Sequence, residues 1–269
     1  MSTQSYVSDE LTHFVGKAKK LPDGKPNNAE RYALFLKILG DRFDLRAPRR
    51  GWLQASYREE FGPGFNMRSD GQKQLSTNDA IRCTMLCFCD IPPGQLGIHI
   101  QKYGSFGIAF SKQFLLRQGA VPVHYVPPNA SNRGVGIGPR TVAERFDTLQ
   151  AELQRVRFDL EEYVTRVDGA AAYLSKLSPS NTPMGHQLLG RFSWLQTELE
   201  ELVFARMKFF TEGLPEDHDE NFYMEREWRL HDGLAFRLED ISRIFLPQDY
   251  TEQFHEAIPD YTAPVCSIE

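Results

Sequence analysis

The sequence predicts an α+β protein in which a mixed sheet core is interrupted by an inserted antiparallel helical hairpin. Short apolar runs bounded by turn residues occur on both sides of the middle of the chain, which is typical of strands. Between them, apolar residues recur at steps of four and three, which is typical of paired helices. The 269 residues, 41% of them hydrophobic, suffice for one core with an insertion. We therefore assign residues 1–139 to the N-terminal part of the core, 140–212 to the hairpin and 213–269 to C-terminal strands that complete the core.

The N-terminal region is expected to begin with a strand and a helix. The strand-like run starts at Ser8 and is closed by Gly16. After a lysine-rich loop, Asn28 is expected to cap an amphipathic helix that stops at Gly40. Residues 46–79 are rich in Arg, Gly, Pro and Asn, so we expect them to be irregular or locally mobile.

Three further strands are expected before the hairpin. Met85–Cys89 is a compact apolar run typical of a buried strand. Residues 106–110 form the second, after which Ser111 is expected to cap a short helix. Residues 121–126 form the third, and Pro122 limits its pairing or places it at a sheet edge, because proline lacks the N–H of a ladder hydrogen bond.

The hairpin is predicted from a coiled-coil-like seam that continues for almost four heptads. Its residues are Val142, Phe146, Leu149, Leu153, Val156, Leu160, Tyr163 and Val167. Residues 169–183 interrupt the pattern, and a second helical stretch runs over about 187–210. Two helices joined by a short break fold back as an antiparallel hairpin. Such a hairpin packs on its own core, grips a partner, regulates access or serves an oligomer.

Strand character returns at residues 222–230 and continues in short strands at 234–236 and 243–247, before a helical tail through Phe254. The net charge of −5 argues against a protein that coats nucleic acid non-specifically. No apolar run reaches the ~20 residues of a membrane span and no signal peptide precedes the polar start, so we expect a cytoplasmic protein without a membrane partner.

The N-terminal 50 residues are basic, unlike the chain as a whole. They include Lys17, Lys19, Lys20, Arg46, Arg49 and Arg50. These side chains predict either a face that holds a phosphate-bearing ligand or a solvated surface.

The spacing of Cys87 and Cys89 suits neither a redox pair nor a zinc knuckle, and the histidines show no ligand spacing, so we expect no metal site. On a strand, Cys87 and Cys89 are expected to share a buried face as small apolar groups.

The strongest chemical signal lies in residues 222–230. On a strand, Glu225, Glu227 and Arg229 fall on one face, because alternate side chains point the same way. Two carboxylates at this spacing have Cβ atoms ~6.5–7 Å apart, which suits sugar chemistry through an oxocarbenium-like transition state. Arg229 would lower their pKa values or hold a phosphate. The alternative is an edge strand whose alternating charges prevent aggregation.

A second group of candidates lies near the middle strands and the first strand. His13 can hydrogen-bond a ribose hydroxyl, although a lone histidine also suits a structural role. Tyr103, Phe106 and Ser111 flank the middle strands, where an aromatic ring can stack on nicotinamide or adenine.

Five blocks in a fixed order together resemble the AbiGi family of abortive phage-resistance proteins. They are SDELTHF at 8–14, LCFCDIP at 86–92, HIQKYGSFGIAFSK at 99–112, PV at 122–123 and EREWR at 225–229. The resemblance implies the first component of a two-gene defence module, with an antitoxin label beside a nucleotidyltransferase-like toxin.

More loosely, the layout resembles ADP-ribosyltransferases, and this second resemblance implies a sheet core of that type. It implies that His13 holds the ribose of NAD, that Tyr103 or Phe106 packs on nicotinamide, and that Glu227 is the catalytic acid with Glu225 upstream. Two hypotheses follow. One is a defence enzyme that uses NAD as substrate to modify nucleic acid or protein. The other is a non-catalytic antitoxin or regulator that binds a cognate toxin.

Overall fold

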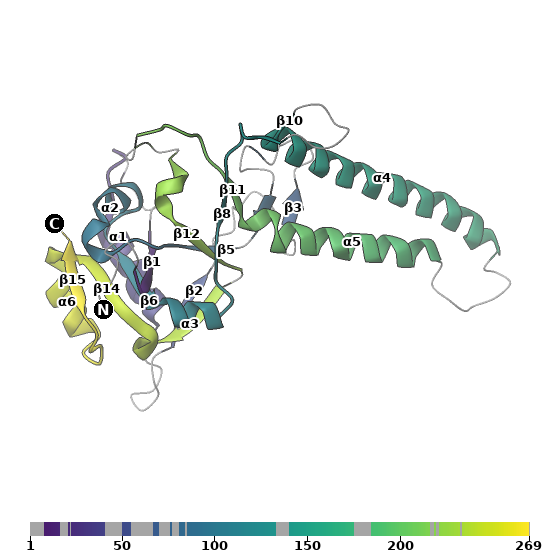
Figure 1. Ribbon diagram of the computed structural model, residues 1–269. Helices are drawn as coiled ribbons and strands as arrows, with labels where there is room; N and C mark the ends of the chain where they lie inside the picture. Colours follow the sequence, from purple (N-terminus) through teal and green to yellow (C-terminus); the bar gives the residue numbers. More distant parts are fainter. Residues whose placement is uncertain are drawn as a thin grey trace. The chain divides into compact units, whose positions relative to one another are not determined.

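The computed structural model describes most of the chain as two compact units (Figure 1). The described residues are 8–16, 21, 23–40, 50–54, 67–69, 76, 81–83, 85–132, 140–174, 184–215, 218, 221–231 and 233–268. Unit 1 combines residues 1–59, 84–123 and 213–269, and unit 2 combines 60–83 and 124–212. The predicted division at 139/140 and 212/213 stays a prediction. The described residues 124–132, which it assigns to the core, cluster with the hairpin in unit 2.

Unit 1 is built on a seven-stranded sheet with the order β15-β14-β6-β1-β5-β12-β7. Only β14 and β15 pair in parallel, and the other neighbours are antiparallel, so the predicted α+β class with a mixed sheet is confirmed. The strands are β1 (Glu10–Phe14), β5 (Met85–Cys89), β6 (Gly107–Ser111), β7 (Val121–Pro122), β12 (Glu227–His231), β14 (Ile241–Pro247) and β15 (Val265–Ile268). Pro122 lies in the edge strand β7, as its missing N–H predicts.

Helices and a second strand pair complete unit 1. The α-helices are α1 (Asn28–Leu39), α2 (Gly97–Tyr103), α3 (Lys112–Arg117) and α6 (Thr251–Ala257). Strands β2 (Arg50–Gln54) and β13 (Gly233–Arg237) pair antiparallel. Short 3-10 turns are η2 (Pro93–Gln95), η5 (Phe222–Glu225), η6 (Leu238–Asp240) and η7 (Gln248–Tyr250).

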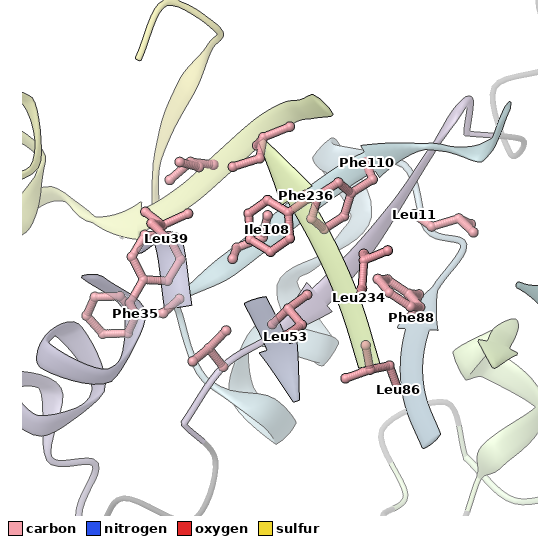
Figure 2. Packing of buried hydrophobic residues seen from close by; sticks show 14 of the residues in the cluster. Leu11, Phe35, Leu39, Leu53, Leu86, Phe88, Ile108, Phe110, Leu234 and Phe236 are labelled. Carbon is pink, nitrogen blue, oxygen red and sulfur yellow. The ribbon is translucent and has the colours of Figure 1, made fainter. Parts of the chain in front are cut away.

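One face of the sheet carries the main core, which Figure 2 shows from close by. Leu11, Phe88, Ile108 and Phe110 project from neighbouring strands and are at most 2% exposed. They pack in one cluster with side chains of α1, β2, β13 and α6. Phe236 of β13 meets Phe110 edge to face, with ring centroids 5.1 Å apart. The opposite face carries a smaller cluster that includes Cys89, Ala109, Phe245 and Leu96.

Local sequence signals explain where the helices begin and end. Asn27, one residue before the predicted cap, accepts a hydrogen bond from the backbone N–H of Glu30. Gly40 ends α1 with φ of 84°, a conformation that glycine adopts without a Cβ clash. Ser111 caps α3 as predicted, because its Oγ accepts a hydrogen bond from the N–H of Phe114 at 3.1 Å.

Unit 2 contains the hairpin formed by α4 (Val142–Leu174) and α5 (Met184–Leu202). Its other elements are β3 (Met67–Ser69), β4 (Ile81–Cys83), β8 (His124–Val126), β9 (Ser131–Asn132), β10 (Arg140–Thr141), η4 (Phe204–Arg206) and β11 (Met207–Phe209). Strands β3 and β4 pair antiparallel, as do β9 and β10, whereas β8 and β11 pair in parallel.

The predicted seam of α4 is only partly correct. Phe146 and Leu153 pack with Phe204, Phe209 and Leu199 near the base of the hairpin. Three members of the predicted seam are exposed instead, because α5 contacts only one side of α4. They are Leu149, Val156 and Tyr163.

The two sides of α4 are expected to differ in their contribution to stability. Leu153→Ala should lower the free energy of unfolding by about 2 kcal/mol, because it removes packed methyl groups. Phe158→Ala, at a position 65% exposed on the same helix, should change it by less than about 0.5 kcal/mol. Urea unfolding followed by far-UV circular dichroism measures both, and equal losses would contradict the assigned packing.

Other predictions from the sequence need correction. The sequence predicts that residues 46–79 are irregular or locally mobile, but the described part of this segment contains β2 and β3. The C-terminal strand β15 was not predicted at all. Cys87 and Cys89 lie on one side of β5, yet only Cys89 is buried, whereas Cys87 is exposed.

Candidate functional site

Glu227 starts β12 and lies on the side of the sheet opposite the main core. The register pairs Glu227 with Cys89 of β5, and Cys89 also pairs with Thr12 of β1. Paired residues of antiparallel strands point to the same side, so the three side chains share one face. Glu227 is 5% exposed. Because β12 lies between β5 and β7, the alternative of an exposed edge strand is wrong.

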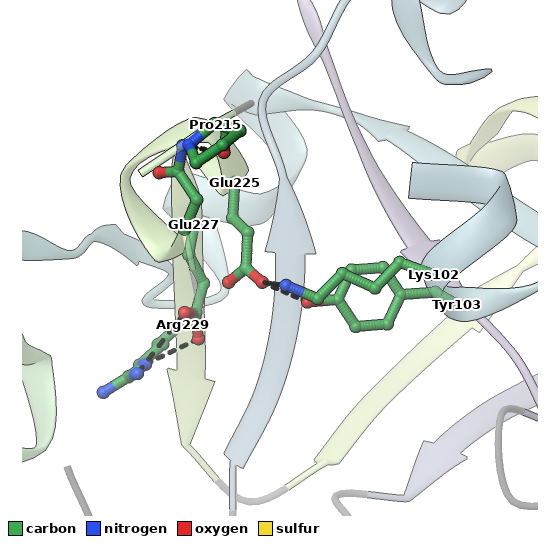
Figure 3. A network of polar contacts seen from close by, with 7 residues as sticks. Lys102, Tyr103, Pro215, Glu225, Glu227 and Arg229 are labelled. Carbon is green, nitrogen blue, oxygen red and sulfur yellow. Dashed lines mark hydrogen bonds and ion pairs between the residues drawn. The ribbon is translucent and has the colours of Figure 1, made fainter. Parts of the chain in front are cut away.

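Arg229 follows two residues later and points to the same side as Glu227. Its Nε donates to Glu227 Oε1 at 2.7 Å, and its terminal nitrogen lies 3.4 Å from Oε2. Figure 3 shows the guanidinium beside the carboxylate. Both side chains are largely buried, so this is an ion pair with little solvent screening. The guanidinium of Arg229 therefore binds the carboxylate of Glu227 in this structure.

Glu225 does not share a strand with Glu227, contrary to the prediction from their spacing. It ends the turn η5, and Arg226 between the two carboxylates has a left-handed backbone with φ of 43°. This conformation breaks the alternation that a strand would impose. Glu225 is nevertheless buried, because Lys102 Nζ donates to its Oε1 at 2.8 Å and the Tyr103 hydroxyl donates to the same oxygen (Figure 3).

The surroundings of Tyr103 favour the protonated form of its hydroxyl, which donates a hydrogen bond to Glu225. Burial raises the pKa of Tyr103, and the adjacent Glu225 carboxylate raises it further. A phenol in this setting stays protonated and holds Glu225 through a charge-assisted hydrogen bond. The Lys102 ammonium also lies 5.3 Å from the centroid of the Phe222 ring, a cation–π contact that fixes the turn η5 beside α2.

A third buried carboxylate, Asp90, lies at the end of β5. Its Oδ2 is 2.8 Å from Lys112 Nζ and 3.5 Å from a terminal nitrogen of Arg226. The Lys112 ammonium also lies 5.8 Å from the Trp228 ring centroid. Sequence reasoning missed Lys102, Lys112 and Asp90 as partners of this network, because the charges that meet here come from distant parts of the chain.

His13 lies on the opposite side of the sheet from Glu227. It pairs with Ile108 of the main core, and its ring centroid is 5.6 Å from that of Phe88. Its Nδ1 is 2.9 Å from the carbonyl oxygen of Cys87. The resemblance to ADP-ribosyltransferases implies that His13 and Glu227 act in one site, but the two side chains lie on opposite sides of the sheet.

The structure places Phe106 in the main core and Ser111 at the start of α3. Phe106 is 0% exposed and its ring packs against Tyr32 and Phe35, so it offers no face to nicotinamide. Ser111 uses its hydroxyl to cap α3. The basic N-terminal face falls outside the described side chains, which include none of its six Lys and Arg residues.

Among the described residues, no three His, Cys, Asp or Glu side chains gather as metal ligands. None of the helices that the structure describes is both long and apolar enough to cross a membrane.

His99 in α2 should make stability depend on pH. It is 6% exposed, and neither ring nitrogen has a hydrogen-bond partner within the described residues. Burial lowers the pKa of His99 from its ordinary 6.5. As pH falls below about 6.5, the unfolded chain binds a proton that the folded chain resists, so the free energy of unfolding should fall.

His99→Phe should therefore flatten the loss of stability between about pH 7 and pH 5, measured by urea unfolding. The matched control is Ile98→Phe, at a position 36% exposed on the same helix, which removes no titratable group and should keep the slope of the wild type. The same slope in His99→Phe as in the wild type would contradict the assignment.

The sequence was also compared with known proteins. A family model described as "Putative abortive phage resistance protein AbiGi, antitoxin" matches residues 64–254, more than half of the chain. The match includes the hairpin and the block from Glu225 to Arg229, but not His13. No curated protein and no solved structure matches the chain.

Proposed function

Because the chain belongs to the AbiGi family, whose description names abortive phage resistance and an antitoxin, we propose that it is the antitoxin of a phage-defence module and restrains a cognate toxin protein by binding it. This is a role for a binding protein, in which surfaces rather than reactive groups determine the outcome.

The internal pairing of the buried carboxylates carries the proposal. Glu227 is bound by Arg229, and Glu225 is bound by Lys102 and Tyr103. Buried carboxylates with such ion pairs and hydrogen bonds fix the positions of neighbouring elements relative to one another. His13, the candidate for binding ribose, lies on the other side of the sheet. The arrangement thus supports a structural use of these residues in a protein that acts by association.

The test is co-expression with the toxin encoded by the neighbouring gene. The toxin alone should arrest growth, and co-expression of the chain should restore it, with both proteins recovered together when the chain carries an affinity tag. The double variant Glu227→Leu/Arg229→Leu removes both charges of the buried pair together and should restore growth as the wild type does. Growth arrest that persists with the wild-type chain would contradict an antitoxin role, and rescue without a complex would contradict restraint by binding.

A second candidate is an NAD-using enzyme that transfers ADP-ribose to nucleic acid or protein. It is favoured by the gathering of Glu225, Glu227, Arg229 and Tyr103 in one network at one end of the sheet. If it holds, the wild-type protein should release nicotinamide from NAD, and Glu227→Leu/Arg229→Leu, which removes both charges of the buried pair, should abolish the release with little loss of helical signal. A wild-type protein without nicotinamide release, with candidate acceptors present, would eliminate this candidate.

A further inference from the structure

The hairpin of unit 2 carries a row of exposed apolar side chains on each helix. On α4 the row consists of Leu149, Val156 and Tyr163, which are 44%, 42% and 57% exposed. On α5 it consists of Leu188, Leu195 and Leu202, which are 47%, 57% and 51% exposed. Both rows repeat every seven residues, so each forms a stripe along its helix.

On each helix, the exposed residues of the stripe come three positions after residues that pack against the rest of the hairpin. On α4, Leu149 and Val156 come three residues after Phe146 and Leu153, which pack at the base of the hairpin. On α5, Leu202 comes three residues after Leu199 of the same cluster. Near the other end, a Cβ at Gly185 would lie 3.2 Å from Val164 Cγ2, so the two helices are in close contact there as well.

This offset places both stripes on one side of the hairpin. A step of three residues rotates a side chain by the same angle and in the same sense about each helix axis. The two helices face each other and run in opposite directions, so the two rotations carry both stripes to the same side. We call these six side chains the hairpin face.

The seam between the helices is, by contrast, partly polar. Gln150, Gln196 and Glu200 are 6%, 5% and 8% exposed, and Gln196 donates to Glu200 at 2.8 Å. The apolar side chains of each helix lie on its packed side and also three residues further on, so the apolar sector is wider than a single seam requires. Helices with such a sector are typical of four-helix bundles, in which each helix contacts two neighbours.

We propose that a second copy of this chain covers the hairpin face, so that two hairpins form an antiparallel four-helix bundle. The area fits this occupant. Six large apolar side chains about half exposed offer on the order of 600 Å² per copy, or roughly 1,200 Å² for two copies, which reaches the lower end of stable interfaces. The hairpin also has approximate two-fold symmetry, since its two stripes have equal length and spacing. An identical copy therefore presents a matching surface, as a closed isologous dimer needs.

The experiment is light scattering of the purified chain at several concentrations, with no toxin present. The chain mass is 30.8 kDa, and the wild type should have twice this mass. The double variant Val156→Glu/Leu195→Glu should have the monomer mass, with the dissociation constant raised at least ~100-fold, because charges at an interface centre are desolvated without partners. Phe158→Glu is the matched control: its position is 65% exposed on α4 but outside the stripe, so it should stay dimeric.

A milder double variant, Val156→Ala/Leu195→Ala, guards against misfolding, because alanine favours helix at both positions. Circular dichroism should show wild-type helix content for it, and its dissociation constant should rise at least ~10-fold. A wild type of monomer mass at every concentration would overturn the proposal. So would a dimer that survives both double variants, or one that Phe158→Glu dissociates equally well. These outcomes are independent of toxin binding, since no toxin is present.

Discussion

Arg229→Ala is expected to lower the free energy of unfolding by about 3–5 kcal/mol, although it removes a side chain from one strand only. Glu227 would remain buried beside β5 while losing the guanidinium that binds both of its oxygens. A buried carboxylate without a neutralising charge destabilises the folded state by more than the intact ion pair stabilises it. The loss of one partner is therefore more damaging than the loss of both. Glu227→Leu combined with Arg229→Leu removes both charges and should restore most of the loss.

The measurement is urea unfolding followed by tryptophan fluorescence in a Trp194→Phe background. The chain has three tryptophans, so the remaining Trp52 and Trp228 both report on unit 1. Arg237→Ala is the matched control, because its ion pair with Glu239 joins side chains that are 55% and 70% exposed. Exposed pairs contribute at most about 1 kcal/mol. A loss in Arg229→Ala no larger than in this control would show that the buried pair is not a stabilising element.

Phe110→Ala is expected to have an effect of similar size, about 3–5 kcal/mol, through a different cause. Phe110 is 0% exposed, and its ring lies 5.1 to 6.3 Å from the rings of Phe88, Phe114 and Phe236. Its removal leaves a cavity where β6 meets β13. The same fluorescence assay measures it, and Leu116→Ala, at a position 53% exposed on α3, should lose less than about 1 kcal/mol. Equal losses in the two variants would place Phe110 outside the core.

The parts of the fold that depend on local sequence could be predicted. The apolar run of β5 and the cap at Ser111 are signals contained in a few adjacent residues, and both are confirmed. The stretch around Glu225 was wrong for a non-local reason. Its alternating charges predicted a strand, but contacts with Lys102 and Tyr103, more than 120 residues away in the chain, hold it in a turn instead.

The facing of site residues could not be predicted, because it depends on strand register. His13 and Thr12 are adjacent in sequence, and only the pairing of Thr12 with Cys89 decides which of them lies on the side of Glu227. The hairpin has the same limitation. Its heptad pattern indicates two helices, but the sequence alone does not show which apolar residues contact the other helix. Leu153 packs there, whereas Val156, three residues later, stays exposed.

The pairing of β5 with β12 has a consequence for synthesis on the ribosome. Cys89 and Glu227 are partners in the sheet, yet they are 138 positions apart in the chain (227 − 89), with the whole hairpin between them. At about 5–20 residues per second, β5 emerges on the order of ten seconds before its partner strand exists. The hairpin forms from neighbouring segments and can fold during this interval, because contacts between nearby residues close quickly. The apolar side chains of β5, Leu86 and Phe88 among them, lack this neighbour until β12 has been made, so the nascent chain is a natural substrate for chaperones in that interval.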